Sequence, residues 1–412
     1  MIRRLFLPVS LASLLALPLM APAAAEDIKP TPYKEMAGAV NDFARDFYGR
    51  VSGGDGNLFF SPYSVHAAML LTREGADGAT LAEMDKVLGI DGFNAGQGYI
   101  GLMGAMLPPN VTDGFGKDRR KIPAYTLDVA NALWGHKGFA FEQPFLDKLA
   151  KTYAAPLSRV DFMQSAIARK VINDWVAKAT RDKIKDIVPE GLPTPDTRLA
   201  LANAIYLKAQ WQDAFREENT KDGDFTGPEG KTSKAKLMHR KGSYRYAEID
   251  GVQVLEIPYR NGHLAMHVYL PKDHTGLKEV EQKLREGKLD GERSVQTVDV
   301  KLPRWKFTTS LDITSTLAKM GMPLAFDPAK ADFSKMSTAQ RLYIGVVLHK
   351  AFVAVDEKGT EAAAATVVMM KLAGARPGAH QPKVFHADHP FVFEIRHRRT
   401  GAILFAGRVT KP

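Results

Sequence analysis

The 412-residue sequence contains no cysteine. That absence excludes disulfide scaffolds, thiolate zinc sites, CxxC redox chemistry and cysteine nucleophiles. Beyond the N-terminal segment, no apolar run approaches the roughly 18 residues that a membrane-spanning helix requires. The G-x-S-x-G motif of hydrolases and the H-E-x-x-H motif of metalloproteases are also missing. No nucleophile–base pattern replaces them, so the sequence does not predict an enzyme.

Phosphate and metal motifs are incomplete as well. Residues 227–232 end in Gly-Lys-Thr, but Phe225 stands where a phosphate loop requires glycine. We therefore predict a turn between two strands over residues 224–231. His386 and His389 have H-x-x-H spacing without an accompanying carboxylate pattern. No metal and no cofactor are expected.

Positive charge is only slightly in excess. The chain has 56 Lys and Arg against 46 Asp and Glu, a formal net charge of +10. Over this length the surplus allows weak attraction to anionic surfaces and does not predict nucleic-acid binding. The stretch 108–123 is rich in Pro, Gly and charge and is read as a loop. It carries a basic cluster that is either a solvated surface or a polyanion site: Lys117, Arg119, Arg120 and Lys121.

The N-terminal residues 1–25 have the order of a secretory signal peptide. Arg3 and Arg4 precede an apolar run, and Ala23-Ala24-Ala25 fits an A-x-A cleavage site. The alternative is an uncleaved N-terminal anchor. Cleavage would leave residues 26–412 as a secreted or periplasmic protein of a bacterial envelope. Without disulfides, such an exported chain must be stable by packing alone.

Apolar periodicity predicts helices early in the mature chain and strands late. The expected helices cover residues 33–50, 62–71, 79–88, 142–153, 164–181 and 311–320. The expected strands cover residues 127–134, 198–206, 254–258, 264–270, 298–302, 304–308, 346–355, 390–396 and 402–409. There is no repeat and no long linker, so we predict one α+β domain rather than separate modules.

Residues 357–383 do not fit this plan. They lie between two predicted strands and show neither a turn cluster nor a clear helical stripe. The four alanines at 362–365 favour a helix by intrinsic propensity. A connection of this length inside a compact domain is usually functional or disordered.

Several motifs resemble the serpin family, and they occur in family order over about residues 33–410. The matching segments are Asn57–Ser64, Leu201–Trp211 with Phe215 and Thr220, His349–Ala351, Val355–Thr366 and Phe385–Phe391. Two weaker matches are Ile172–Val176 and Leu255–Tyr259. His386 stands where arginine is common in the family, and Lys358 stands where an acidic residue is commoner.

The resemblance implies a serpin fold with three β-sheets, about nine helices and an exposed reactive-centre loop, here about residues 357–383. It also implies inhibition of a serine protease by suicide-substrate trapping. The protease attacks one loop bond and forms an acyl-enzyme. The cut loop then inserts as a strand into the central sheet and distorts the bound protease. Such a chain is an inhibitor and no enzyme; we expect it to act as a monomer, with no membrane span after signal removal.

The resemblance also assigns roles to individual residues. The hinge of the loop comprises Glu357, Gly359, Thr360, Ala362, Ala363, Ala364 and Ala365. The polar cluster where the central sheet parts, which we call the shutter, comprises Ser61, Ser64, Asn203 and His349. Trp211 marks the breach, the place where insertion begins.

The residues themselves favour an insertable loop. Alternate side chains of a strand face opposite sides. With Thr360 facing inward, the same face receives only small or apolar groups down to Leu372, whereas Glu361 and Lys371 fall on the other face. An unpaired buried charge would oppose insertion. This pattern favours an inhibitory serpin over a non-inhibitory binding or chaperone protein that is only cleaved.

The reactive bond is placed by counting. About seventeen residues from Glu357, as in the family pattern, lead to the bond between Ala373 and Gly374. Small residues there suit an elastase-like or subtilisin-like protease. The alternatives are Leu372 for a chymotrypsin-like protease, and Lys371 or Arg376 for a trypsin-like one, although Pro377 disfavours cleavage after Arg376.

Overall fold

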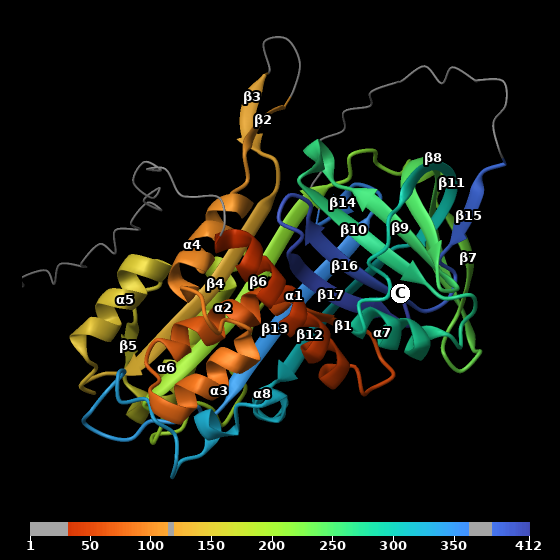
Figure 1. Ribbon diagram of the computed structural model, residues 1–412. Coiled ribbons are helices and arrows are strands. Elements are labelled where there is room, and N and C mark those ends of the chain that lie inside the picture. The colour runs from red at the N-terminus through yellow and green to blue at the C-terminus, as the bar shows by residue number, and fades with distance from the viewer. Residues whose placement is uncertain (1–31, 114–118, 362–380) are drawn as a thin grey trace, which may run out of the picture. The chain divides into compact units, whose positions relative to one another are not determined.

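Two large β-sheets and the helices that cover them make up most of the structure (Figure 1). The computed structural model describes residues 32–113, 119–361 and 381–412, which all belong to one unit, Thr31–Pro412. The described residues contain eight α-helices, where about nine were expected. They are α1 (Pro32–Val51), α2 (Pro62–Arg73), α3 (Gly78–Leu88), α4 (Ala95–Met106), α5 (Gln143–Tyr153), α6 (Ser165–Ala179), α7 (Leu277–Arg285) and α8 (Thr314–Met320).

The strands form three sheets, as the resemblance implied. The six-stranded sheet has the order β12 (Trp305–Asp312), β13 (Val347–Asp356), β14 (Gly359–Thr360), β6 (Leu199–Gln210), β4 (Thr126–His136) and β5 (Ser158–Val160). The nine-stranded sheet has the order β1 (Leu58–Phe60), β17 (Ile403–Val409), β16 (Phe391–His397), β10 (Leu264–Leu270), β9 (Val252–Pro258), β8 (Thr232–Ile249), β11 (Ser294–Pro303) and β15 (Lys383–His386), with β7 (Lys221–Thr226) paired to β8. The third sheet is a hairpin of β2 (Asn110–Asp113) and β3 (Arg120–Pro123).

Each face of the six-stranded sheet has its own core. Ile205 and Ala209 of β6 point into the large core that also contains α1, α2 and the nine-stranded sheet. Ala202 and Ala204, the alternate residues, pack instead against α6 and the segment that follows it. Because strand side chains alternate, the sheet is buried on both faces over much of its area.

Local signals correctly located several elements. Ser61 is the N-cap of α2, and its hydroxyl accepts a hydrogen bond from the Ser64 N–H at 3.1 Å. Pro62 occupies the first turn, where its missing N–H costs nothing. The predicted strand 264–270 matches β10, and the predicted turn between 224 and 231 connects β7 to β8.

The prediction of a loop over residues 108–123 is wrong, because much of this stretch forms a β-hairpin. β2 and β3 pair in antiparallel register, with Val111 opposite Ile122, and the hairpin extends beyond the six-stranded sheet (Figure 1). Of the described prolines in this stretch, Pro108 and Pro109 precede β2, whereas Pro123 lies in β3 and pairs with Asn110. Arg120 and Lys121 are therefore on β3, next to Arg119. Lys117 lies outside the described residues.

Two helix predictions also need correction. The predicted helix 311–320 begins later, because β12 continues to Asp312, whose carboxylate accepts the Thr314 N–H at 3.0 Å. α4 was not predicted at all, since four glycines within residues 95–106 hide its helical signal. Asn94 caps it by accepting the Gln97 N–H at 3.1 Å.

The proposed signal peptide, residues 1–25, lies outside the described residues, and the domain boundary 26–412 stays a prediction. Of the helices that are described, none combines the length and the apolar character needed to cross a bilayer.

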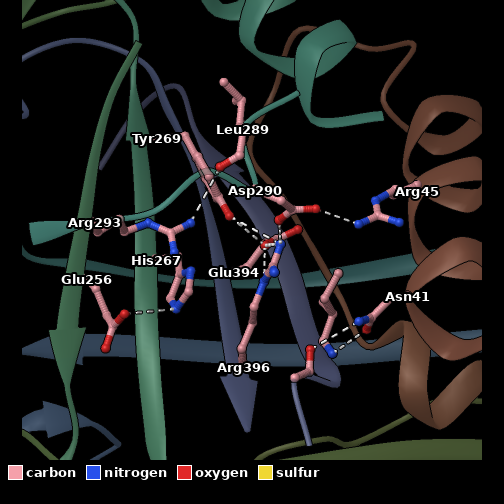
Figure 2. A network of polar contacts seen from close by, with 12 residues as sticks. Asn41, Arg45, Glu256, His267, Tyr269, Leu289, Asp290, Arg293, Glu394 and Arg396 are labelled. Atoms are coloured by element: carbon pink, nitrogen blue, oxygen red, sulfur yellow. Dashed lines mark hydrogen bonds and ion pairs between the residues drawn. The ribbon is translucent and has the colours of Figure 1, made fainter. Parts of the chain in front are cut away.

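An ionic network, buried at Glu394 and partly exposed at Arg45 and Asp290, ties the nine-stranded sheet to α1 (Figure 2). The Arg396 guanidinium lies 2.6 Å from the Glu394 carboxylate and 3.1 Å from the Asp290 carboxylate. Asp290 also pairs with Arg45 of α1 at 2.6 Å, and the Tyr269 hydroxyl donates to Glu394 at 2.9 Å. Buried charges are tolerated when they are paired and hydrogen-bonded in this way. The network therefore holds β10, β16 and α1 together.

We expect Gly407→Ala to reduce the free energy of unfolding by about 1–3 kcal/mol, the usual range for overpacking. A Cβ at Gly407 of β17 would lie 2.4 Å from the carbonyl oxygen of Leu58 on β1, so the two strands must separate. Urea unfolding measures the change. Gly38→Ala is the control: a Cβ there meets no atom within 4 Å, and alanine should stabilise α1 by about 0.5–1 kcal/mol. Equal stability of the Gly407 variant and the wild type would contradict the expectation.

Candidate functional site

The candidate site is a fork in the six-stranded sheet. β13 and β6 pair directly and in parallel over Val347–Ala351 and Leu201–Ile205. That pairing stops at Ala351 and Ile205. Further along, Gly359 and Thr360 lie between the two strands, antiparallel to both. The described part of the predicted loop thus enters the sheet as a strand of two residues. The four alanines at 362–365, whose propensity favoured a helix, lie outside the described residues.

Thr360 is held in the fork from the large-core side. The residue is 3% exposed, and its hydroxyl lies 2.6 Å from the hydroxyl of Tyr259, which follows β9. The Tyr259 ring stacks on Trp211 with the ring centroids 4.5 Å apart. Burial raises the pKa of Tyr259 well above its ordinary value of 10, so its hydroxyl stays neutral. The inward face of Thr360 is therefore uncharged and closed to solvent.

Gly359 fits because it has no side chain. A Cβ there would lie 2.1 Å from the carbonyl oxygen of Ala209, and its φ is +150°. The turn from β13 is fixed by the carboxylate of Asp356, which accepts the N–H groups of Lys358 at 2.8 Å and Gly359 at 3.2 Å. Burial raises the pKa of Asp356. Glycine at this position is thus required by the close approach of β6.

Glu357 anchors the same turn from the side. Its carboxylate pairs with Arg304 at 2.5 Å and accepts the hydroxyl of Thr220 at 2.5 Å. Burial alone would raise the pKa of Glu357, but the bonds from Arg304 and Thr220 outweigh it and hold the pKa below its usual value. The indole N–H of Trp211 donates to the Asp356 carbonyl at 2.9 Å. Trp211 and Glu357, which were predicted for the breach and hinge, therefore meet at one end of the sheet.

The four shutter residues also meet, at the directly paired part of β13 and β6. His349 and Asn203 are register partners, and the His349 Nδ1 lies 2.6 Å from the Asn203 Oδ1. The His349 Nε2 lies 3.1 Å from the backbone nitrogen of Ser61. Since that N–H is a donor, Nε2 must accept, and the proton is on Nδ1. Asn203 Nδ2 completes the cluster by donating to the Ser64 carbonyl at 2.8 Å.

The shutter is a neutral network. Burial lowers the pKa of His349 to about 3, far below its ordinary 6.5. A protonated imidazole would turn Nε2 into a donor facing the Ser61 N–H. The network thus depends on an uncharged His349 and joins α2 to both strands that must part if another strand is to enter.

Several predicted residues lie outside the described part of the chain. They are Ala362, Ala363, Ala364 and Ala365 of the hinge, and Lys371, Leu372, Ala373, Gly374 and Arg376 around the reactive bond. Of the possible metal ligands, His389 bonds to Asp388 at 2.8 Å and to the Pro271 carbonyl at 3.0 Å. The described residues contain no cluster of three or more His, Cys, Asp or Glu that could hold a metal ion.

Other residues of the site were missed by sequence reasoning. These are Tyr259, Arg304, Thr220, Lys183 and Asn131. Tyr259 and Thr220 fell inside or beside quoted motifs, but no sequence signal showed that they contact the hinge. Asn131 lies opposite Asn203 in the register of β4 and β6 and bonds to it. These contacts arise between strands distant in sequence, so only the register shows them.

Comparison with known proteins gives consistent matches. Residues 38–412 match the family described as serpin (serine protease inhibitor). An uncharacterized serpin-like protein of Thermococcus kodakarensis is 37% identical, covering 93% of this chain and 88% of its own. The leukocyte elastase inhibitor of Equus caballus is also 37% identical, covering 92% and 100%. The crystal structure of a highly specific serpin of the insect Tenebrio molitor superposes with a TM-score of 0.80 at 29% identity, covering 92% and 98%.

We expect the free energy of unfolding to fall as the pH drops below about 6.5, partly through His349. The unfolded imidazole binds a proton near pH 6.5, whereas the folded one binds it only near pH 3. The contribution of His349 to the free energy of unfolding is therefore fully present above pH 6.5 and is lost as the pH falls toward 3. His66 and His397, whose pKa values burial lowers to about 4, act in the same direction.

The measurement compares urea unfolding at pH 7 and pH 5 for wild type and His349→Gln. Between pH 6.5 and 5 a single such histidine costs about 2 kcal/mol. The variant, which cannot titrate at this position, should lose about that much less than the wild type. Identical losses would show that His349 does not titrate as its burial requires.

Proposed function

Because the chain belongs to the serpin family of serine protease inhibitors, we propose that it traps its target protease as a suicide substrate. The serine oxygen of the protease would bond to a carbonyl carbon of the reactive loop. The peptide bond to the next residue breaks, and its nitrogen leaves as a protonated amine. The loop then inserts between β13 and β6 before water can release the acyl group. The inhibitor supplies the cleavable loop and the inserting strand, and the protease supplies the catalytic groups.

The fork carries this proposal. β14 already occupies the entrance between the two strands, antiparallel to each. Only five register pairs join β13 directly to β6 below it. A longer β14 would replace these parallel pairs with two antiparallel ladders, one on each side. Antiparallel pairing is slightly more stable per residue than parallel pairing, and two ladders would replace one. Insertion of the cut loop therefore lowers the free energy of the sheet.

Side-chain direction supports the same step. Thr360 faces the large core and Glu361 faces the α6 side, where it pairs with Lys183. Continued alternation would place Ala362 and Ala364 inward, beneath Thr360. Small inward groups can enter a packed core without burying charge. These residues support an inhibitory loop more than one that is merely cleaved.

For the target, we propose an elastase-like or subtilisin-like protease and a reactive bond between Ala373 and Gly374. Small residues on both sides of the bond suit a shallow specificity pocket. Relatives that are 35–37% identical include leukocyte elastase inhibitors. Leu372, Lys371 and Arg376 are the alternative cleavage positions.

The proposal also covers the setting of the protein. Residues 1–25 would direct export to the periplasm or the medium, leaving 26–412 as one inhibitory domain without catalytic activity of its own. The basic residues at 119–121 on and beside β3 form the candidate polyanion surface. They lie on the hairpin that leads into β4, at the end of the sheet where β14 enters (Figure 1).

Incubation with pancreatic elastase and with subtilisin should yield a covalent complex that survives SDS. Mass spectrometry of the released C-terminal fragment should find a new N-terminus at Gly374. The cleaved protein should also melt at a higher temperature than the intact one, because the sheet gains a strand. Cleavage with neither a covalent complex nor a rise in melting temperature would instead support a non-inhibitory binding or chaperone protein.

Thr360→Arg should convert the inhibitor into a substrate. The guanidinium would replace a hydroxyl that is buried against Tyr259, and an unpaired buried charge costs several kcal/mol, enough to change partitioning by at least about tenfold. The readout is the number of inhibitor molecules consumed for each protease molecule trapped. Thr360→Ser keeps the hydroxyl and is the matched control. Unchanged trapping by the arginine variant would refute insertion through this position.

A further inference from the structure

The segment that follows α6, residues 181–186, crosses the sheet on the α6 side; we call it the strap. Its Arg181 pairs with Asp128 of β4 at 2.9 Å. At its other end, the Lys350 ammonium of β13 donates to the Lys185 carbonyl at 2.6 Å. The strap is therefore tied to strands on both sides of the fork and lies over the gap between them.

Between these two ties, Lys183 reaches the first residue beyond β14. Its ammonium lies 2.6 Å from the Oε1 atom of Glu361 and 5.8 Å from the ring centroid of Phe352 on β13. The Glu361 N–H donates to the Ala354 carbonyl at 2.8 Å, and its φ is +51°, which is unusual for a residue with a side chain. Glu361 is thus held in a specific and locally strained position.

Among the described residues, Lys183 is the cation that pairs with the Glu361 carboxylate. The Glu361 side chain is 14% exposed, and its second oxygen, Oε2, is buried without a hydrogen-bond partner among the described residues. A carboxylate in such a place is costly unless it is paired. Without Lys183, the carboxylate would gain most by moving out to water and taking the backbone of the hinge with it.

We propose that Lys183 is a positioning residue for the reactive loop: its ion pair with Glu361 holds the loop at two inserted residues. Thr360 is fixed from the core side by Tyr259, and Glu361 is fixed from the opposite side by the strap. Withdrawal of the hinge breaks both contacts, and deeper insertion requires Glu361 to leave its left-handed conformation, φ +51°, for the extended conformation of a strand. The pair therefore sets the resting depth of the loop and, on the proposed inhibitory function, how readily a protease reaches it.

The resting position can be tested without any protease. Amide hydrogen exchange of the segment 357–361 should be about fivefold faster in Lys183→Ala than in wild type, the size expected when a partly buried ion pair is lost. Lys185→Ala removes the same charge from the same strap and should leave exchange unchanged. Lys183→Arg should retain wild-type exchange, because arginine can still pair with the carboxylate. Protection of β10 serves as the check that each variant is folded.

Swapping the charges of Lys183 and Glu361 distinguishes the loss of their ion pair from the loss of side-chain volume. Lys183→Glu alone should accelerate exchange more than the alanine variant, and adding Glu361→Lys should restore protection close to that of wild type. The association rate constant with elastase should rise about fivefold for Lys183→Ala. It should return to the wild-type value in the double variant Lys183→Glu with Glu361→Lys. Equal exchange in Lys183→Ala and Lys185→Ala, or no restoration in the double variant, would overturn the proposal. A chain that traps no protease but still shows these exchange differences would contradict the inhibitory function alone.

Discussion

The structure depends on a short stretch of parallel pairing between β13 and β6. Five register pairs close the six-stranded sheet at its centre, and beyond them the strands part around β14. Parallel pairs are slightly weaker per residue than antiparallel ones. The centre of the sheet is thus joined by only a few parallel pairs, and the polar side chains of the site are arranged around that place.

The two faces of the fork are electrostatically different. On the large-core side, contacts are made by neutral groups: the imidazole of His349, the amide of Asn203 and the hydroxyls of Tyr259 and Thr360. On the strap side and at the sheet end, contacts are made by ion pairs, Lys183 with Glu361 and Arg304 with Glu357. Neutral hydrogen bonds can be exchanged in a core at modest cost, whereas a charge must keep its partner or reach water. The inner face can therefore rearrange while the outer contacts fix the starting position.

Much of the fold was predictable because local chemistry and tertiary packing agree. Ser61 and Pro62 start α2 as capping rules require, and the apolar residues of 264–270 form a strand buried on both faces. α4 was missed because its glycines oppose a helix locally, while their small size suits close packing: a Cβ at Gly98 would lie 3.0 Å from Met36 of α1. The hairpin of β2 and β3 was missed because the prolines and glycines of the stretch 108–123 indicated a loop by composition.

The sequence by itself determined the strand-and-helix plan, the order of the motifs and which side chains of the loop share a face, because these follow from local spacing. Only the tertiary structure decided how far the loop enters the sheet and what holds it there. Tyr259 meets Thr360, and Lys183 meets Glu361, across separations of more than one hundred residues. Such contacts depend on strand register and on the path of the segment after α6, which no local pattern encodes.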